Sequence, residues 1–241
     1  MPFGASRAGL MSVAADDIPD SVVEHLDYWW SLDEGDGTTT TDALQEETAT
    51  LVGSWTQDNS YFGGFKITQN GVDDSWITDN QLTGVHDGDV AVVGRIALDS
   101  TDDISRPFIL TQSSDLDRTS PSIELRIIDN ERFNLRLEDN SGNAEGVDLI
   151  TGQDAANQDW YYVLNMNVES SVSAELYLYD ENGEFATGTA SSNSIDTANS
   201  AYFGLLSGGI EGDADVYGIA TEKQLDQTAR DELWTETYLL N

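Results

Sequence analysis

From Leu26 onward, apolar and polar side chains alternate with a period of two, which is typical of half-buried β-strands. In the first such segment Leu26, Tyr28 and Trp30 share one face, whereas Trp29 lies among polar residues on the other face. Similar segments recur at short intervals and are separated by turn residues. We expect strands at residues 65–68, 75–78, 90–98, 107–112, 122–128, 132–138, 145–150, 160–168, 174–179, 184–187, 202–206 and 213–221.

The clearest hairpin lies at residues 122–138, where two alternating strands flank a short polar segment. A three-residue loop pairs Ile123 with Leu137 on one face and sets Glu124 opposite Arg136 on the other. The same register pairs Leu125 with Leu135 and Ile127 with Phe133. A two-residue loop would mix the two faces, so the pattern predicts the longer loop.

One helix is convincing, and it lies close to the C-terminus. Asp226 is placed to cap its first turn, and Leu233 and Trp234 lie inside it. Many short strands followed by one terminal helix predict an all-β fold, a sandwich of two antiparallel sheets. The 241 residues fit one large domain over residues 21–241, preceded by an N-terminal arm at residues 1–20.

The charge balance is extreme, with 45 Asp and Glu against 10 Lys and Arg and a formal net charge of −35. Such self-repulsion strains a compact fold in dilute buffer, but at molar salt the Debye length shrinks to roughly 3 Å. Six Trp, nine Tyr and seven Phe argue against an acidic disordered chain. Nucleic acid is excluded as a partner because there is no basic stripe to meet phosphates.

The chain has no cysteine, which excludes disulfides, thiolate metal sites and cysteine nucleophiles. No apolar run approaches the ~18 residues of a membrane-spanning helix, so we expect no membrane insertion. Small polar residues and glycines interrupt the first 15 residues, which therefore lack the apolar run of a secretion signal. We expect no signal peptide.

Four segments, in order along the chain, resemble concanavalin A-like and laminin-G-like jelly-roll domains. The first, residues 28–42, holds an aromatic strand, an acidic pair, a glycine and a threonine run that ends in Asp. The others are the Gly-x-Asp-Asp-x-aromatic turn at 71–77, the strand at Trp160 with the hairpin at 176–183, and the closing strand at 212–219. The resemblance covers about residues 26–240 and implies a jelly-roll sandwich. It leaves function open, because this fold hosts lectins, enzymes, adhesins and capsid decorations.

The high acid content with only two lysines resembles proteins of haloarchaea and their viruses, and residues 4–10 and 18–21 resemble N-termini of haloarchaeal virus structural proteins. These resemblances imply a non-enzymatic virion protein, such as a capsid turret, decoration or tail-fibre subunit on the virion surface. We expect a homo-oligomer whose arm, free of acidic residues over its first 15 positions, docks on other virion proteins. The docking residues are then Phe3, Arg7, Leu10 and Met11. The alternative for the arm is a solvated tail.

A carbohydrate-binding module that recognises cell-surface glycans is the alternative function. Aromatic faces stack on sugar rings while carboxylates and amides bind the hydroxyl groups. The candidate binding residues are Trp29, Trp76, Tyr177 and Tyr179. Core packing competes with this interpretation for the last three, and a subunit interface competes for Trp29. Trp30 and Trp160 are assigned to the core.

Catalysis is disfavoured. Hydrolytic relatives of the fold carry Glu-x-Asp-x-Glu on one strand, and the nearest match here, residues 211–215, ends in Asp. No cofactor is required, although the resemblance implies a structural Ca²⁺ between the opening loop and the closing strand. Its matching ligands are Asp33, Asp36, Asp42 and Asp215. The alternative for these carboxylates is a solvated acidic face.

Overall fold

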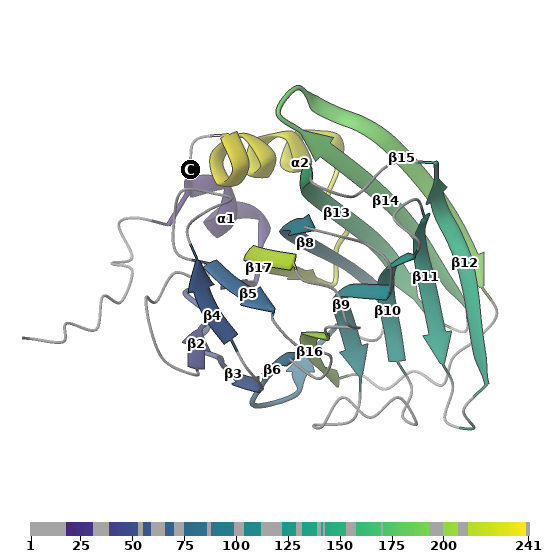
Figure 1. Ribbon diagram of the computed structural model, residues 1–241, viewed down its shortest axis with the longest axis horizontal. Coiled ribbons are helices and arrows are strands. Elements are labelled where there is room, and N and C mark those ends of the chain that lie inside the picture. Colours follow the sequence, from purple (N-terminus) through teal and green to yellow (C-terminus); the bar gives the residue numbers. More distant parts are fainter. Residues whose placement is uncertain are drawn as a thin grey trace, which may run out of the picture.

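The computed structural model describes residues 18–30, 39–52, 55–58, 66–69, 75–85, 88–98, 104–111, 122–128, 132–138, 141, 143–152, 158–169, 171–192, 200–206 and 212–239. Within these residues the strands form two sheets, and every strand pairing is antiparallel (Figure 1). The predicted all-β sandwich of two antiparallel sheets is confirmed.

Sheet A contains eight of the described strands. From edge to edge they are β15 (Gly183–Ser192), β14 (Val172–Asp180), β13 (Gln158–Val168), β8 (Gly88–Leu98), β17 (Gly212–Thr221), β5 (Lys66–Gln69) and β4 (Trp55–Asp58), with β1 (Tyr28–Trp30) also paired to β17. Sheet B contains nine of the described strands. They are β12 (Ala144–Thr151), β11 (Arg132–Glu138), β10 (Ser122–Ile128), β9 (Ile104–Thr111), β16 (Ser200–Leu206), β6 (Ser75–Thr78), β3 (Thr48–Val52) and β2 (Thr39–Thr41), with β7 (Leu82–Thr83) on β16.

The main core fills the space between the two sheets. Trp30 and Trp160 are buried in it, as predicted, beside Phe133 and Phe203. The hairpin of β10 and β11 has the predicted register, which pairs Ile123 with Leu137. Because the side-chain period is exactly two, this register sends Ile123, Leu125 and Ile127 of β10 and Phe133, Leu135 and Leu137 of β11 into the core.

A second core lies on the outer face of sheet A, under two helices that lie against each other (Figure 1). They are α1 (Asp20–His25) and α2 (Gln227–Trp234), and α2 continues as a π-helical turn over Thr235–Leu239. The Asp226 carboxylate accepts the Ala229 N–H at 3.0 Å, so the predicted cap is confirmed. The short helix α1 was not predicted. In the described residues no helix has both the length and the apolar character needed to cross a membrane.

The second core corrects the interpretation of Trp29. The alternation placed this side chain on a polar, solvent-facing side, but it is only 4% exposed. It packs under the helices with Val22 and Leu233, while its neighbour Trp30 points into the main core. A strand covered on both faces has no solvent side, so its alternation does not separate exposed from buried residues.

The sandwich closes along one side, where edge strand β12 of sheet B packs on edge strand β15 of sheet A. A Cβ atom added at Gly188 would lie 1.9 Å from the Leu149 carbonyl oxygen, so only glycine allows this approach. At the other end of the sandwich, β5 and β6 flank the Asn70-Gly71 turn signal but lie in different sheets.

Candidate functional site

Several predicted site residues lie outside the part of the chain that the structure describes. The docking residues Phe3, Arg7, Leu10 and Met11 and the calcium ligands Asp33 and Asp36 are among them. Trp76 and Asp215 lie in β6 and β17, but their side chains are likewise not described. Arm docking and calcium binding therefore stay predictions.

Asp42 is the one predicted calcium ligand whose side chain is described, and it is 1% exposed. Its carboxylate accepts the backbone N–H groups of Trp29, Leu44 (3.2 Å) and Gln45. Burial raises the pKa of this carboxyl group, although the backbone N–H groups act in the opposite direction. These contacts fix the loop that follows β2. The described residues contain no group of three or more His, Asp or Glu side chains arranged to hold a metal ion.

Tyr179 is fully buried in the second core, so its ring face is not available to a sugar. The Arg230 Nε–H donates to its hydroxyl oxygen at 3.2 Å, and the hydroxyl donates to Glu184 Oε2 at 3.3 Å. Burial raises the pKa of Tyr179. Both Trp29 and Tyr179 therefore stabilise the layer between sheet and helices, and neither forms part of an exposed binding face.

Tyr177 is half-buried at the edge of that layer, on the outer face of β14. The Arg230 guanidinium carbon lies 3.6 Å from the centre of its ring and so covers one face of it. The Tyr177 hydroxyl donates to Glu175 Oε2 at 2.5 Å. Burial and this hydrogen bond raise the pKa of Tyr177 to about 12, so the hydroxyl remains a donor at neutral pH. Arg230 thus fixes Tyr177, and Tyr177 in turn fixes the Glu175 carboxylate.

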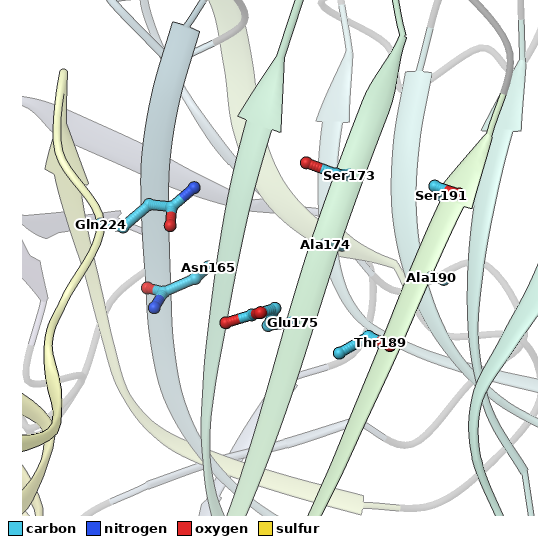
Figure 2. Close-up of a pocket in the computed structure, with 8 residues that line it drawn as sticks. All are labelled: Asn165, Ser173, Ala174, Glu175, Thr189, Ala190, Ser191 and Gln224. Carbon is cyan, nitrogen blue, oxygen red and sulfur yellow. The ribbon is translucent and has the colours of Figure 1, made fainter.

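Glu175 stands in a pocket of about 320 Å³ on the outer face of β13, β14 and β15, beyond the helices (Figure 2). The strand register aligns Asn165, Glu175 and Thr189 across the three strands. Figure 2 shows Gln224 entering from the segment after β17. The lining residues are Asn165, Ser173, Ala174, Glu175, Thr189, Ala190, Ser191 and Gln224.

Two of the polar side chains in this pocket are engaged within the protein. The Asn165 amide donates to the Leu225 carbonyl oxygen at 2.8 Å and accepts the Leu225 N–H at 3.0 Å. Gln224 Nε2 donates to Asp89 Oδ1 at 3.1 Å. Both groups tie the segment between β17 and α2 to sheet A, and so build one wall of the pocket.

The remaining polar groups in the pocket are exposed. In the described part of the chain, the hydroxyls of Ser173, Thr189 and Ser191 have no hydrogen-bond partner, and neither has Glu175 Oε1. Among the described residues that line the pocket, none is Lys, Arg or His. The pocket therefore presents three hydroxyls, which donate and accept, around one carboxylate oxygen, which accepts only. Sequence reasoning did not find this site, because its residues are common ones spread over three strands.

A second polar cluster, on the outer face of sheet B, is largely paired within the protein, although the buried Ser122 hydroxyl beside it has no hydrogen-bond partner among the described residues. Arg136 pairs with the fully buried Glu124 at 2.9 Å, as the hairpin register predicted, and also with Glu138. Asn134 donates to Asp148 at 2.9 Å. A ligand that took one partner from this buried ion pair would leave the other charge buried without compensation. We therefore assign the pair to the stability of the fold and not to ligand binding. The segment at 211–215 has no described side chains.

No family model matches the chain, and no curated protein matches it. Among solved structures, the receptor-binding domain of botulinum neurotoxin mosaic serotype C/D is similar, with a TM-score of 0.62 and 11% identity over 91% of this chain and 52% of that chain. The binding domain of botulinum neurotoxin DC in complex with SialylT has a TM-score of 0.60 and 12% identity over 91% of this chain and 53% of that one. A Trypanosoma rangeli sialidase in complex with sialic acid has a TM-score of 0.60 and 12% identity over 90% of this chain and 34% of that one.

At these identities the likeness shows the fold alone. The chain spans about half the length of the toxin domains and a third of the sialidase. The fold class is an all-β jelly-roll sandwich of two antiparallel sheets with one C-terminal helix, as the resemblance to concanavalin A-like domains implied.

Proposed function

We propose that this domain is a carbohydrate-binding module that takes a neutral sugar in the pocket on β13, β14 and β15. One observation carries the proposal. Glu175 Oε1 and the hydroxyls of Ser173, Thr189 and Ser191 line a pocket of about 320 Å³, and in the described part of the chain none of these four groups has a hydrogen-bond partner. This volume lies at the lower end of small-molecule pockets.

The chemistry of these groups matches that of a sugar, because each sugar hydroxyl both donates and accepts a hydrogen bond. A carboxylate oxygen accepts from one or two neighbouring hydroxyls, and charge-assisted hydrogen bonds of this kind are about twice as strong as neutral ones. The Tyr177 hydroxyl holds the other oxygen of Glu175 at 2.5 Å. The acceptor is therefore positioned before the sugar binds, which reduces the entropy lost on binding.

The electrostatics favour a neutral sugar over an acidic one. The described lining of the pocket includes a carboxylate and no cationic side chain, on a chain with net charge −35. Two similar structures were solved with SialylT and with sialic acid. A sialic acid carboxylate in this pocket would lie beside the Glu175 carboxylate, and two negative charges in contact repel each other.

The affinity of one pocket should be low. None of the described lining residues is aromatic, and Arg230 covers one face of the Tyr177 ring beside Glu175, so the described residues offer the sugar no open stacking platform. Binding then rests on hydrogen bonds that replace hydrogen bonds to water, each with a small net gain. We expect a dissociation constant of about 1 mM for a single sugar, which corresponds to about −4 kcal/mol.

A panel of neutral and sialylated glycans, titrated in molar salt by calorimetry, tests the proposal. We expect heat with neutral glycans and none with their sialylated forms. The variant Glu175→Ala should weaken binding by about tenfold or more, which is the effect of losing one charge-assisted hydrogen bond. The matched control is Glu181→Ala, an exposed glutamate in the turn between β14 and β15. Equal affinity in both variants, or no heat with any glycan, would refute the proposal.

We also propose, on the sequence alone, that the domain works without catalysis on the surface of a halophilic virus particle. The supports are the net charge of −35 and the acid-free first 15 residues. Antibodies against the domain should label intact particles, and incubation with a bound glycan should release no new reducing ends. Glycan cleavage would contradict the non-enzymatic role. The absence of antibody labelling would contradict the location on the particle surface.

A further inference from the structure

The described lining of the pocket extends further across the strands than along them. On β14 and on β15 it covers two outward positions, which lie about 7 Å apart along a strand. Across the strands, Figure 2 shows Gln224 and Asn165 at one end, Glu175 in the middle, and Thr189 and Ser191 at the other end. The floor from β13 to β15 alone spans two strand spacings, about 10 Å, and Gln224 extends it. One pyranose ring is shorter than this floor.

Gln224 supplies a second fixed acceptor, at the β13 end of the pocket. Its Nε2 donates to Asp89 Oδ1 at 3.1 Å, and the same oxygen accepts a hydrogen bond from Asn167 Nδ2 at 2.8 Å. An ionised carboxylate only accepts hydrogen bonds, so Asp89 determines which side of the Gln224 amide is the NH₂ group. The amide oxygen Oε1 has no hydrogen-bond partner in the described part of the chain. It is therefore available to accept from a ligand hydroxyl.

The backbone that carries Gln224 is tied to the rest of the fold on both sides. Residues 222–225 connect β17 to α2, and Leu225 exchanges two hydrogen bonds with the Asn165 amide. Just before this segment, the Thr221 N–H donates to Asp27 Oδ2 at 2.7 Å. These contacts fix the position of Gln224 relative to the strands of sheet A before any ligand binds.

Two acceptors are thus held at separate points of one pocket. Gln224 is tied to β8, and Glu175 lies on β14, which is two strands away in the sheet. Asp89 orients the first acceptor, and the Tyr177 hydroxyl orients the second at 2.5 Å. The hydroxyls of Thr189 and Ser191 on β15 both donate and accept beyond them.

We infer that the pocket binds a linear chain of two or more neutral sugar units, which lies across β13, β14 and β15. This inference deepens the proposed function and rests on it. Hydroxyls of the middle part of the chain donate to Glu175 Oε1, and a hydroxyl at one end donates to Gln224 Oε1. The other end exchanges hydrogen bonds with Thr189 and Ser191. Each further contact adds to the small affinity of a single sugar.

Calorimetry in molar salt with glycans of increasing length tests the inference. The probes are the β-1,4-linked series of glucose, mannose, galactose and N-acetylglucosamine, each from the single sugar to the trisaccharide. In at least one series we expect affinity to rise about fivefold or more between one unit and three, since one further neutral hydrogen bond contributes about this factor.

The two ways in which this titration can fail are distinguishable. Equal affinity for one unit and for three, in every series that gives heat, overturns this inference and leaves the proposed function standing. No heat in any series refutes the proposed function, and this inference with it.

The variant Gln224→Ala tests the end of the site beside Asp89. It should bind the single sugar as wild type does and lose about fivefold in affinity for the trisaccharide. The matched control is Gln227→Ala, an exposed glutamine in the first turn of α2, which should change neither affinity. Thermal melts check that both variants keep their fold. An unchanged trisaccharide affinity in Gln224→Ala, or an equal loss for both ligands, overturns the inference.

Ser191→Ala tests the opposite end and leaves the connecting segment intact. Ser191 is exposed on β15, so its hydroxyl can be removed with little effect on folding. Affinity for the trisaccharide should fall while affinity for the single sugar is retained. The control on the same strand is Thr187→Ala, an exposed residue that is not part of the described lining. Equal trisaccharide affinity in Ser191→Ala and Thr187→Ala contradicts a chain that reaches β15.

Discussion

The outer face of sheet A has two halves whose outward side chains differ in polarity and in burial, although the strands alternate in the same way in both. Over β1, β8 and β17 the outward residues are apolar and buried, as Trp29 and Val93 are. Over β15 and the first half of β14 they are polar and exposed, as Ser173 and Thr189 are. Helices α1 and α2 cover only the first of these halves, so the candidate site begins where the helices end.

Arg230 stands at the boundary between the two halves. Its Nη1 donates to the Leu225 carbonyl oxygen at 3.0 Å and its Nε donates to Tyr179, inside the covered half. Its guanidinium also stacks on Tyr177, which holds Glu175 in the open half. One side chain of α2 thus connects the packing of the helix to the position of the carboxylate that we assign to sugar binding.

The largest effect is expected in the covered half. Trp29→Ala removes a side chain that is 4% exposed, and burial of this kind predicts a loss of about 3–5 kcal/mol in the free energy of unfolding. Urea titration in molar salt measures it. The control is Val23→Ala on α1, which is 59% exposed and should change stability by less than about 0.5 kcal/mol. Similar losses in the free energy of unfolding for the two variants would show that Trp29 is not part of a buried core under the helices.

A smaller loss is expected at the loop that holds Trp29 in place. Asp42→Ala leaves the backbone N–H groups of Trp29, Leu44 and Gln45 without their acceptor. Unsatisfied buried donors of this kind reduce the free energy of unfolding by about 2–3 kcal/mol. Asp42→Asn retains one carbonyl acceptor and should lose less in the same urea titration. If Asp42→Ala is as stable as wild type, the carboxylate does not organise this loop.

The same comparison shows what could be predicted from the sequence. The register of β10 and β11 was predictable because alternation and loop length determine it locally, and the Asp226 cap is equally local. The burial of Trp29 and Tyr179 was not, because nothing in a strand's own pattern reveals that a distant helix covers it. The pocket was missed for a related reason. Only strand pairing brings Glu175 and Thr189 together.

The pH dependence of stability tests the environment of Tyr177, which lies at the boundary between the covered and the open half. The pKa of Tyr177 is raised from 10.0 to about 12, so between these pH values the folded protein holds a proton that the unfolded chain has released. Stability from this group is complete below pH 10 and falls as pH rises towards 12. The free energy of unfolding of Tyr177→Phe should therefore fall less steeply with pH than that of wild type, by the slope that one bound proton contributes. Urea titration between pH 10 and 12 measures both slopes. An unchanged slope would show that Tyr177 ionises normally.

The smallest stability effect is expected in the open half. Glu175→Ala changes an exposed side chain, so the free energy of unfolding should shift by less than about 0.5 kcal/mol. Thermal melts in molar salt measure this shift. A larger loss would mean that Glu175 supports the fold and would weaken the argument that the protein leaves it available for a ligand.

Backbone amide shifts in an NMR titration with a neutral sugar test the central claim most directly. The account predicts that the largest shifts fall on Ser173, Glu175, Thr189 and Ser191, and that Glu175→Ala needs about tenfold more sugar or more to reach the same shifts. Sugar-induced shifts confined to the outer face of sheet B, around Arg136 and Glu124, would place the binding site elsewhere and contradict the account.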